Sequence, residues 1–187
     1  MKMRGGSREM KERLKVGDKA PDFKFETPWE GGKGFYGEAG EKPAVLVFLR
    51  YLGCPICQVD MANLRSEIGL IEKKGAVLFV ILQSSPETVA SATKKEDWPF
   101  TIICDPRGSL FQLYHVEPGG ILKYMHPAGL IAAVKATLQG YRHGKFEGHE
   151  TQLPGVFIVA PGKTIRYAHY GANLSDIPPT ATMAEHK

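Results

Sequence analysis

The chain has 187 residues, of which 43% are hydrophobic and 24% are charged, with three cysteines and a formal net charge of +4. This share of apolar side chains excludes a disordered chain, and three cysteines cannot staple a disulfide scaffold. No apolar run approaches the ~20 residues that a membrane-spanning helix needs, so we expect one domain with a hydrophobic core and no membrane partner.

Residues 1–15 are polar and basic, and we expect them to form a solvated helix or tail. Their basic residues are interrupted by Glu9 and Glu12, and no aromatic side chain stands among them to stack on a base. We therefore expect no nucleic-acid partner. The segment also lacks the apolar run of a secretory signal, so we expect a cytoplasmic protein.

The runs of apolar residues predict the strands. An alternating stretch at 20–25 indicates a strand at a sheet edge, and 27–42 is a Gly-, Pro- and Glu-rich loop or hairpin. Continuous apolar runs, typical of strands buried on both faces, predict four more strands, at 44–49, 76–82, 100–104 and 155–159. A tight turn at Pro161-Gly162 leads into an antiparallel partner at 164–170.

From Pro55 onward the apolar residues recur at the period of a helix. The residues on this apolar face are Cys57, Met61, Leu64, Ile68 and Ile71. A second helix is predicted from the N-cap Ser85 to about Lys95, and others over 109–114 and 127–138.

This order of elements predicts an α/β fold of three layers, with a central mixed sheet flanked by helices. The first strands should be parallel with right-handed crossovers, and the final hairpin should add an antiparallel edge. Residues 117–150 form an unusually long connection that is a lid, a dimer contact or a specificity element. We expect residues 179–187 to be a flexible tail.

The chemistry is predicted at Cys54-Pro55-Ile56-Cys57. The pair bridges a buried strand and the first turn of a helix, at the sheet edge where ligands and chemistry gather in parallel sheets. Free backbone N–H groups and the helix dipole favour a thiolate there, and the thiolate is the reactive form of cysteine. Arg50, four residues before Cys54, either adds positive potential or reaches solvent.

The helical spacing separates the roles of the two thiols. Cys57 lies on the apolar face and should be partly buried, whereas Cys54 precedes the helix and should face solvent. In a dithiol mechanism, Cys54 attacks and Cys57 resolves the mixed disulfide. Which cysteine attacks first stays open from sequence alone.

Several stretches together resemble one known family. They are VLVFLRYLGCPIC at 45–57, VGDKAPDF at 16–23, FTIICDP at 100–106 with YHV at 114–116, and LPGVFIV at 153–159. The pattern is similar to the thioredoxin superfamily and, more narrowly, to its AhpC/TSA redoxin, peroxiredoxin-like branch. The resemblance implies a thioredoxin-like domain over 16–178 with an insertion at 117–150.

The resemblance also implies site residues. In the superfamily, a proline before the fourth strand is cis and faces the dithiol, and Pro154 matches that position. It is therefore grouped with the two cysteines as catalytic. The residues next to these groups, Gly53, Pro55 and Leu153, together with Arg50, are the implied binding residues.

The sequence departs from peroxiredoxins at two assisting positions. Cys54 stands where they carry Thr or Ser three residues before the peroxidatic cysteine, whose place Cys57 takes. Pro154 stands where they carry an Arg before the closing strand. These replacements favour dithiol–disulfide chemistry. Phe48 stands where thioredoxins carry a buried proton-relaying Asp, so no such relay is expected.

Two further residues are weaker candidates. Cys104 ends a predicted strand at the same sheet edge and is either a third redox thiol or a buried structural cysteine. His149, in a loop with His143, Glu147 and Glu150, is either a base for Cys54 or a solvated side chain. The cysteine pair supplies two of the about four ligands that zinc needs, so we expect no metal and no cofactor.

We therefore predict a thiol-based oxidoreductase that cycles Cys54 and Cys57 between dithiol and disulfide. Its partners would be a disulfide or hydroperoxide substrate and a thioredoxin-like or small-thiol reductant. Two alternatives remain: an antioxidant thiol peroxidase that reduces hydroperoxides, and a non-catalytic metal-binding or interaction module. The oligomeric state, a homodimer included, is open.

Overall fold

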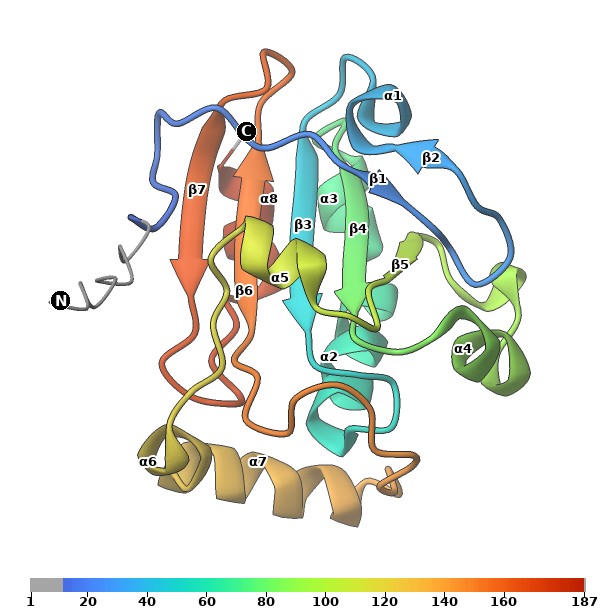
Figure 1. Ribbon diagram of the computed structural model, residues 1–187, viewed down its shortest axis with the longest axis vertical. Coiled ribbons are helices and arrows are strands. Elements are labelled where there is room, and N and C mark those ends of the chain that lie inside the picture. The colour runs from blue at the N-terminus through green and yellow to red at the C-terminus, as the bar shows by residue number, and fades with distance from the viewer. Residues whose placement is uncertain (1–11, 187) are drawn as a thin grey trace, which may run out of the picture.

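The computed structural model describes residues 12–186 and contains a five-stranded sheet with the order β5-β4-β3-β6-β7 (Figure 1). Its strands are β3 (Ala44–Leu49), β4 (Val77–Leu82), β5 (Thr101–Cys104), β6 (Gly155–Val159) and β7 (Ile165–Tyr170). β3, β4 and β5 are parallel, while β6 pairs antiparallel with β3 and β7 with β6. The predicted mixed sheet and its antiparallel hairpin are confirmed.

Helices cover both faces of the sheet, which forms the middle of three layers (Figure 1). The helices are α1 (Phe35–Ala39), α2 (Pro55–Ser66), α3 (Ile68–Glu72), α4 (Pro86–Ala92), α5 (Ser109–Leu113), α6 (Ile121–Tyr124), α7 (Pro127–Leu138) and α8 (Thr180–Glu185), with a 3-10 turn at Lys95–Asp97. One core includes Leu64 of α2 and Ile71 of α3, and the other includes Phe35 of α1 and Phe111 of α5. The predicted three-layer α/β fold is therefore correct.

β3 lies between these two cores because all six of its side chains are apolar and buried. Val45, Val47 and Leu49 face one core, and Leu46 and Phe48 face the other. Successive side chains of a strand point to opposite faces, so an unbroken apolar run suits a central strand. The site residues directly follow β3 and therefore lie at the end of the central strand of the sheet.

The helix expected to run from Pro55 to Ile71 is divided into two. α2 ends at Ser66, and Glu67, whose backbone leaves helical geometry, separates it from α3. The second predicted helix is also shorter, because α4 ends at Ala92 before the 3-10 turn. Both differences fall at helix ends, where sequence periodicity says least.

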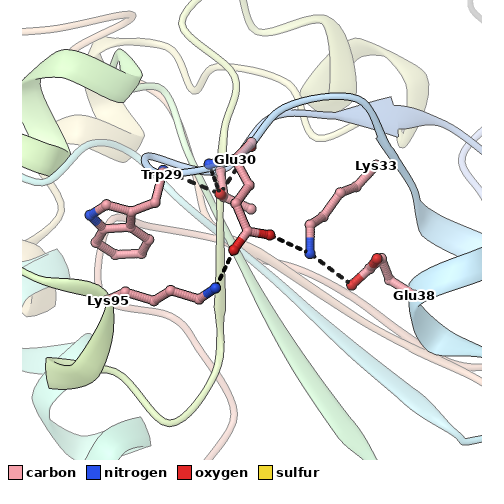
Figure 2. Close-up of polar contacts among 6 residues, drawn as sticks. Trp29, Glu30, Lys33, Glu38 and Lys95 are labelled. Atoms are coloured by element: carbon pink, nitrogen blue, oxygen red, sulfur yellow. Dashed lines mark hydrogen bonds and ion pairs between the residues drawn. The ribbon is translucent and has the colours of Figure 1, made fainter.

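The N-terminal strand pairs away from the central sheet. β1 (Lys24–Phe25) forms a separate two-stranded sheet with β2 (Lys33–Gly34), so the expected edge strand at 20–25 is shorter. Glu26 alone bridges to Cys104 of β5. Glu30 forms ion pairs with Lys33 at 2.8 Å and with Lys95, which ties this hairpin to the turn after α4 (Figure 2). The prediction for residues 1–15 falls mostly outside the described residues.

The expectation of a flexible tail at 179–187 is wrong for the residues that the structure describes. Thr180–Glu185 forms α8, which lies against α3 on the same side of the sheet (Figure 1). Met183 is 2% exposed and belongs to the core beneath α2 and α3. The short segment orders because it buries apolar side chains that local periodicity did not reveal.

The long connection 117–150 contains α6 and α7, and α7 packs against α2. After α7 the chain returns beneath the carboxyl ends of β3 and β4 before entering β6 (Figure 1). Among the described residues, no helix is both long enough and apolar enough to cross a membrane. The connection therefore brings α7 and its following segment to the edge of the sheet where the cysteine pair lies.

Candidate active site

The cysteine pair stands where β3 gives way to α2. Cys54 is the N-cap of α2, and its Sγ accepts a hydrogen bond from the Cys57 backbone N–H at 3.4 Å. Pro55 occupies the first turn, where its missing N–H costs no hydrogen bond. The strand, turn and helix agree with the prediction, and they put the Cys54 sulfur at the positive end of the helix dipole.

Arg50 contacts Cys54 directly. Its Nη2 donates a hydrogen bond to Cys54 Sγ at 2.9 Å, and its side chain is 8% exposed. Its Nη1 donates to the backbone carbonyl of Glu150 and lies 3.6 Å from the Glu150 carboxylate. Of the two alternatives for Arg50, the geometry therefore favours a guanidinium that faces the thiol over one that reaches solvent.

The surroundings drive the pKa values of the two thiols apart. A hydrogen bond from the Cys57 side chain and the positive charge of Arg50 lower the pKa of Cys54 to about 6, against the opposing effect of burial. Burial raises the pKa of Cys57 well above its ordinary value, and the neighbouring Cys54 raises it further. At neutral pH, Cys54 is therefore the thiolate and Cys57 the thiol, which suits an attacking and a resolving cysteine.

Cys54 does not face solvent as expected, because it is 0% exposed. The segment 141–150 covers the turn before it. The Gly144 N–H donates to the Gly53 carbonyl at 2.8 Å, and the Tyr51 hydroxyl lies 3.0 Å from His143 Nε2. The sequence could not show this cover, because its contacts join residues about 90 positions apart.

Gly53 permits the close approach of this segment. A Cβ atom at Gly53 would collide with the Lys145 carbonyl oxygen and would lie 2.9 Å from the Gly144 carbonyl carbon. A side chain at this position would therefore displace the covering backbone. Gly53, predicted as a binding residue, is thus in contact with the backbone of Gly144 and Lys145, which its lack of a side chain permits.

A cavity of about 550 Å³ lies between α2 and α7 and is lined by Arg50 and Pro55 on the dithiol side. Its opposite wall comes from α7, through Leu130, Ala133 and Thr137. The cavity thus approaches the guanidinium that holds the Cys54 sulfur.

Asp60 is a functional candidate that the sequence reasoning missed. It follows Cys57 by one turn of α2, and its Oδ2 is buried without a hydrogen-bond partner among the described residues. Burial, assisted by the negative charge of Cys54, raises the pKa of Asp60 to about 8. Phe48 occupies the strand position where a proton-relaying Asp would stand, whereas the signal for Asp60 is its i, i+3 spacing from Cys57 on the helix.

The expectation that Pro154 is cis is wrong. The bond between Leu153 and Pro154 is trans, like all peptide bonds in the described residues. Trans is the lower-energy isomer, and here the Pro154 carbonyl accepts a hydrogen bond from the Gly171 N–H at 2.9 Å. The Pro154 carbonyl is therefore already bonded within the chain. Leu153 is buried in the same core cluster as Cys54 and Cys57.

The weaker candidates lie apart from the thiol contact. Cys104 aligns with Leu82, which aligns with Leu49, so it is two strands away from β3, about 10 Å across the sheet. Burial and nearby carboxylates raise its pKa to about 12. The His149 side chain is exposed, and its ring makes no hydrogen bond to any described residue.

Within residues 12–186, no three His, Cys, Asp or Glu side chains are grouped so that they could hold a metal ion. The cysteine pair instead combines a thiolate bonded to the Arg50 guanidinium with a buried thiol, and the buried Asp60 carboxyl senses the charge of Cys54.

Replacing Arg50 should raise the pKa of Cys54. Arg50→Gln removes the positive charge that stabilises the thiolate, so the midpoint should rise by about one unit or more. The thiolate fraction below the original midpoint would then fall about tenfold. The measurement is the pH dependence of Cys54 alkylation, read by mass spectrometry. Arg65→Gln is the matched control, since Arg65 lies on α2 over Trp98. An unchanged midpoint in Arg50→Gln would contradict the assigned role.

Gly53→Ala should uncover Cys54. The new Cβ meets the backbone at Gly144 and Lys145, so the covering segment must shift. We expect faster labelling of Cys54 by a small thiol reagent and a loss of about 1–3 kcal/mol in unfolding free energy. Gly69→Ala is the control, because a Cβ there meets open space on α3. Equal labelling rates in the variant and the wild type would show that the segment does not limit access.

Asp60→Asn should change how stability depends on pH. The pKa of Asp60 is raised on folding, so the folded state binds a proton that the unfolded state loses from about pH 4 upward. Wild-type stability from this group therefore falls as pH rises toward about 8. Urea unfolding at about pH 5 and about pH 8 should show Asp60→Asn gaining on the wild type. Asp97→Asn is the control and should show no such trend, because Asp97 is an exposed carboxyl with a lowered pKa. If the stability of Asp60→Asn relative to the wild type did not rise between these two pH values, the raised pKa assigned to Asp60 would be refuted.

Comparison with known proteins agrees with this fold. The model of the AhpC/TSA family matches residues 16–168. Peroxiredoxin-like 2C from Bos taurus is 23% identical over 155 residues, which cover 78% of this chain and 68% of that protein.

Solved structures support the same fold. A peroxiredoxin-like protein from Aquifex aeolicus has a TM-score of 0.66 at 17% identity, with 93% of this chain and 86% of that one covered. The reduced 2-Cys peroxiredoxin of Plasmodium vivax has a TM-score of 0.65 at 14% identity, with 90% and 78% covered. Since the family match extends over most of the chain, the protein belongs to the AhpC/TSA family and is a thiol-based oxidoreductase of the peroxiredoxin-like type.

Proposed function

We propose that the protein reduces a small hydroperoxide through a Cys54–Cys57 dithiol cycle. The observation that carries this proposal is the buried Cys54 thiolate, bonded to Arg50 at 2.9 Å and followed one helical turn later by a protonated thiol. Complete burial of Cys54 favours a small oxidant over a folded disulfide substrate. A trans Pro154 held by Gly171 supports the same choice.

The proposed reaction has two steps. The Cys54 thiolate attacks one oxygen of ROOH, the O–O bond breaks, and RO⁻ leaves and takes up a proton to give ROH. Cys54 keeps the hydroxyl as a sulfenic acid. The Cys57 thiol then attacks the sulfenic sulfur, so that the disulfide forms and water leaves.

The neighbouring residues serve different stages of this cycle. Arg50 stabilises the thiolate before attack, and its charge also favours the leaving oxyanion. Asp60, which is protonated at neutral pH, is a proton source next to the pair. The resolving thiol of Cys57 must lose its own proton as the disulfide forms.

We also propose the partners that complete the cycle. Two electrons from a thioredoxin-like protein or a small thiol would return the disulfide to the dithiol, without any bound cofactor. The three free cysteines support a reducing compartment, the cytoplasm.

Thiol–disulfide exchange is the second candidate. It is favoured by the divergent pKa values of the two cysteines at a helix N-terminus, an arrangement that also suits attack on a disulfide. There Cys54 would form a mixed disulfide, and Cys57 would displace the substrate thiol.

One experiment separates the two candidates. Cys57→Ser protein is treated with hydrogen peroxide or with oxidised glutathione, and the adducts are located by mass spectrometry with a sulfenic-acid trap. The peroxidase predicts a trapped sulfenic acid on Cys54, formed at least about 100-fold faster than any at Cys104. Wild type should instead form an intramolecular disulfide, and Cys104→Ser should behave like wild type.

Two other outcomes would contradict the proposed peroxidase cycle. A glutathione adduct on Cys54 with no rapid sulfenic acid would favour disulfide exchange. Adducts on Cys57 in Cys54→Ser protein, at the rate of the wild type, would overturn the assignment of the attacking thiol.

A further inference from the structure

α7 is amphipathic in the reverse of the usual sense. Its small residues Gly129 and Ala136 are buried toward the protein, whereas its large aliphatic residues point outward. The outward residues are Leu130, Ile131, Val134 and Leu138, which are 45%, 55%, 60% and 82% exposed. At 3.6 residues per turn, these four share one face opposite Gly129 and Ala136.

α6 extends this surface. Ile121 and Leu122 are 68% and 85% exposed, and α6 lies next to the start of α7 at one end of the molecule (Figure 1). We call these two residues and the four outward residues of α7 the α6–α7 face. Monomeric soluble proteins seldom expose contiguous apolar surface of this kind unless something binds it.

The charged residues within the stretch that carries the α6–α7 face have one sign. No acidic residue occurs between Glu117 and Glu147, a stretch that contains Lys123, Lys135, Arg142 and Lys145. All four are exposed. The face therefore complements an occupant that is apolar inside and negatively charged at its surface.

A second copy of the chain fits this face less well. In a two-fold dimer the same patch meets itself, so the cations of the two copies would face each other without acidic partners. The face also consists of aliphatic side chains, whereas the energetic centres of protein interfaces are enriched in Trp, Tyr and Arg.

The position of the cavity points the same way. Leu130 belongs to the α6–α7 face and also lines the cavity that leads to Arg50. A rigid partner seated on Leu130 would cover that side of the cavity, whereas a fluid lipid surface leaves it open to apolar molecules.

We propose that the α6–α7 face docks the protein on the surface of an anionic lipid bilayer. The aliphatic side chains would enter the boundary between head groups and acyl chains, and the lysines would lie at the level of the lipid phosphates. Such a contact needs no spanning helix. The sequence-based expectation of no membrane partner considered only spanning, and the proposal is independent of the hydroperoxide reaction.

The test is co-sedimentation of the full chain with vesicles of phosphatidylcholine, alone or with about 30 mol% phosphatidylglycerol. We expect binding to the anionic vesicles, weaker binding to the neutral ones, and release at about 0.5 M salt. The double variant Ile131→Gln/Val134→Gln should lower the partition coefficient at least about tenfold. Lys135→Glu should lower it about fivefold or more.

Matched controls change the same chemistry elsewhere. Leu70→Gln/Leu113→Gln alters two exposed leucines, 39% and 38% exposed, that lie on α3 and α5. Lys74→Glu makes the same charge reversal next to α3. Both should bind vesicles like the wild type, and circular dichroism should show all variants folded.

Three outcomes would overturn the proposal. One is wild-type protein that leaves the anionic vesicles unbound. Another is binding that survives Ile131→Gln/Val134→Gln, which would assign it to another part of the chain, such as the basic residues 1–15. A third is a dimer in sedimentation equilibrium that the double variant dissociates while vesicles stay unbound, which would identify a second copy as the occupant.

Discussion

The Cys54 sulfur is held in the protein interior by the guanidinium of Arg50, 2.9 Å away. A buried thiolate is unfavourable unless a positive charge and hydrogen bonds replace water, and a buried guanidinium needs an acceptor in turn. Glu150 supplies that acceptor through its carbonyl and its carboxylate. The charge pair at the thiol is therefore completed by a residue 100 positions further along the chain.

This requirement explains why the long connection returns across the end of the sheet. The segment after α7 both pairs with Arg50 and covers the turn at Gly53. The same chain segment thus stabilises the thiolate and limits access to it. A mobile segment would weaken the ion pair as it opened the site, so reactivity and exposure of Cys54 are coupled.

α7 meets two demands at once. On its inner side it packs against α2, with Gly129 lying against Leu174, and the cavity between α2 and α7 has Arg50 and Pro55 in its dithiol-side wall. Large aliphatic residues on its outer face are between 45% and 82% exposed. A helix that only stabilised the fold would place these side chains inward, so the reversed pattern indicates a role outside the monomer.

Much of the architecture followed from local pattern alone. The unbroken apolar run 44–49 and the helical spacing from Pro55 onward predicted β3, α2 and the cysteine pair between them, because buried strands and helix caps are encoded over a few residues. The tight turn at Pro161-Gly162 likewise predicted the antiparallel hairpin of β6 and β7. Helix ends were predicted less accurately: the apolar period continues to Ile71, whereas α2 ends at Ser66.

The errors lie where distant segments meet. Its place just before the helix predicted that Cys54 would face solvent. In the structure Cys54 is buried, and residues 141–150 cover the turn that precedes it. The C-terminal segment forms α8, which packs against α3 and buries Met183 in the core. Pro154 is trans, and its carbonyl accepts a hydrogen bond from Gly171. The sequence by itself determined the sheet, the helix that follows β3 and the presence of a dithiol at their junction. Only the tertiary structure decided which thiol ionises and how it is reached, because charge pairing and burial depend on residues brought together from across the chain.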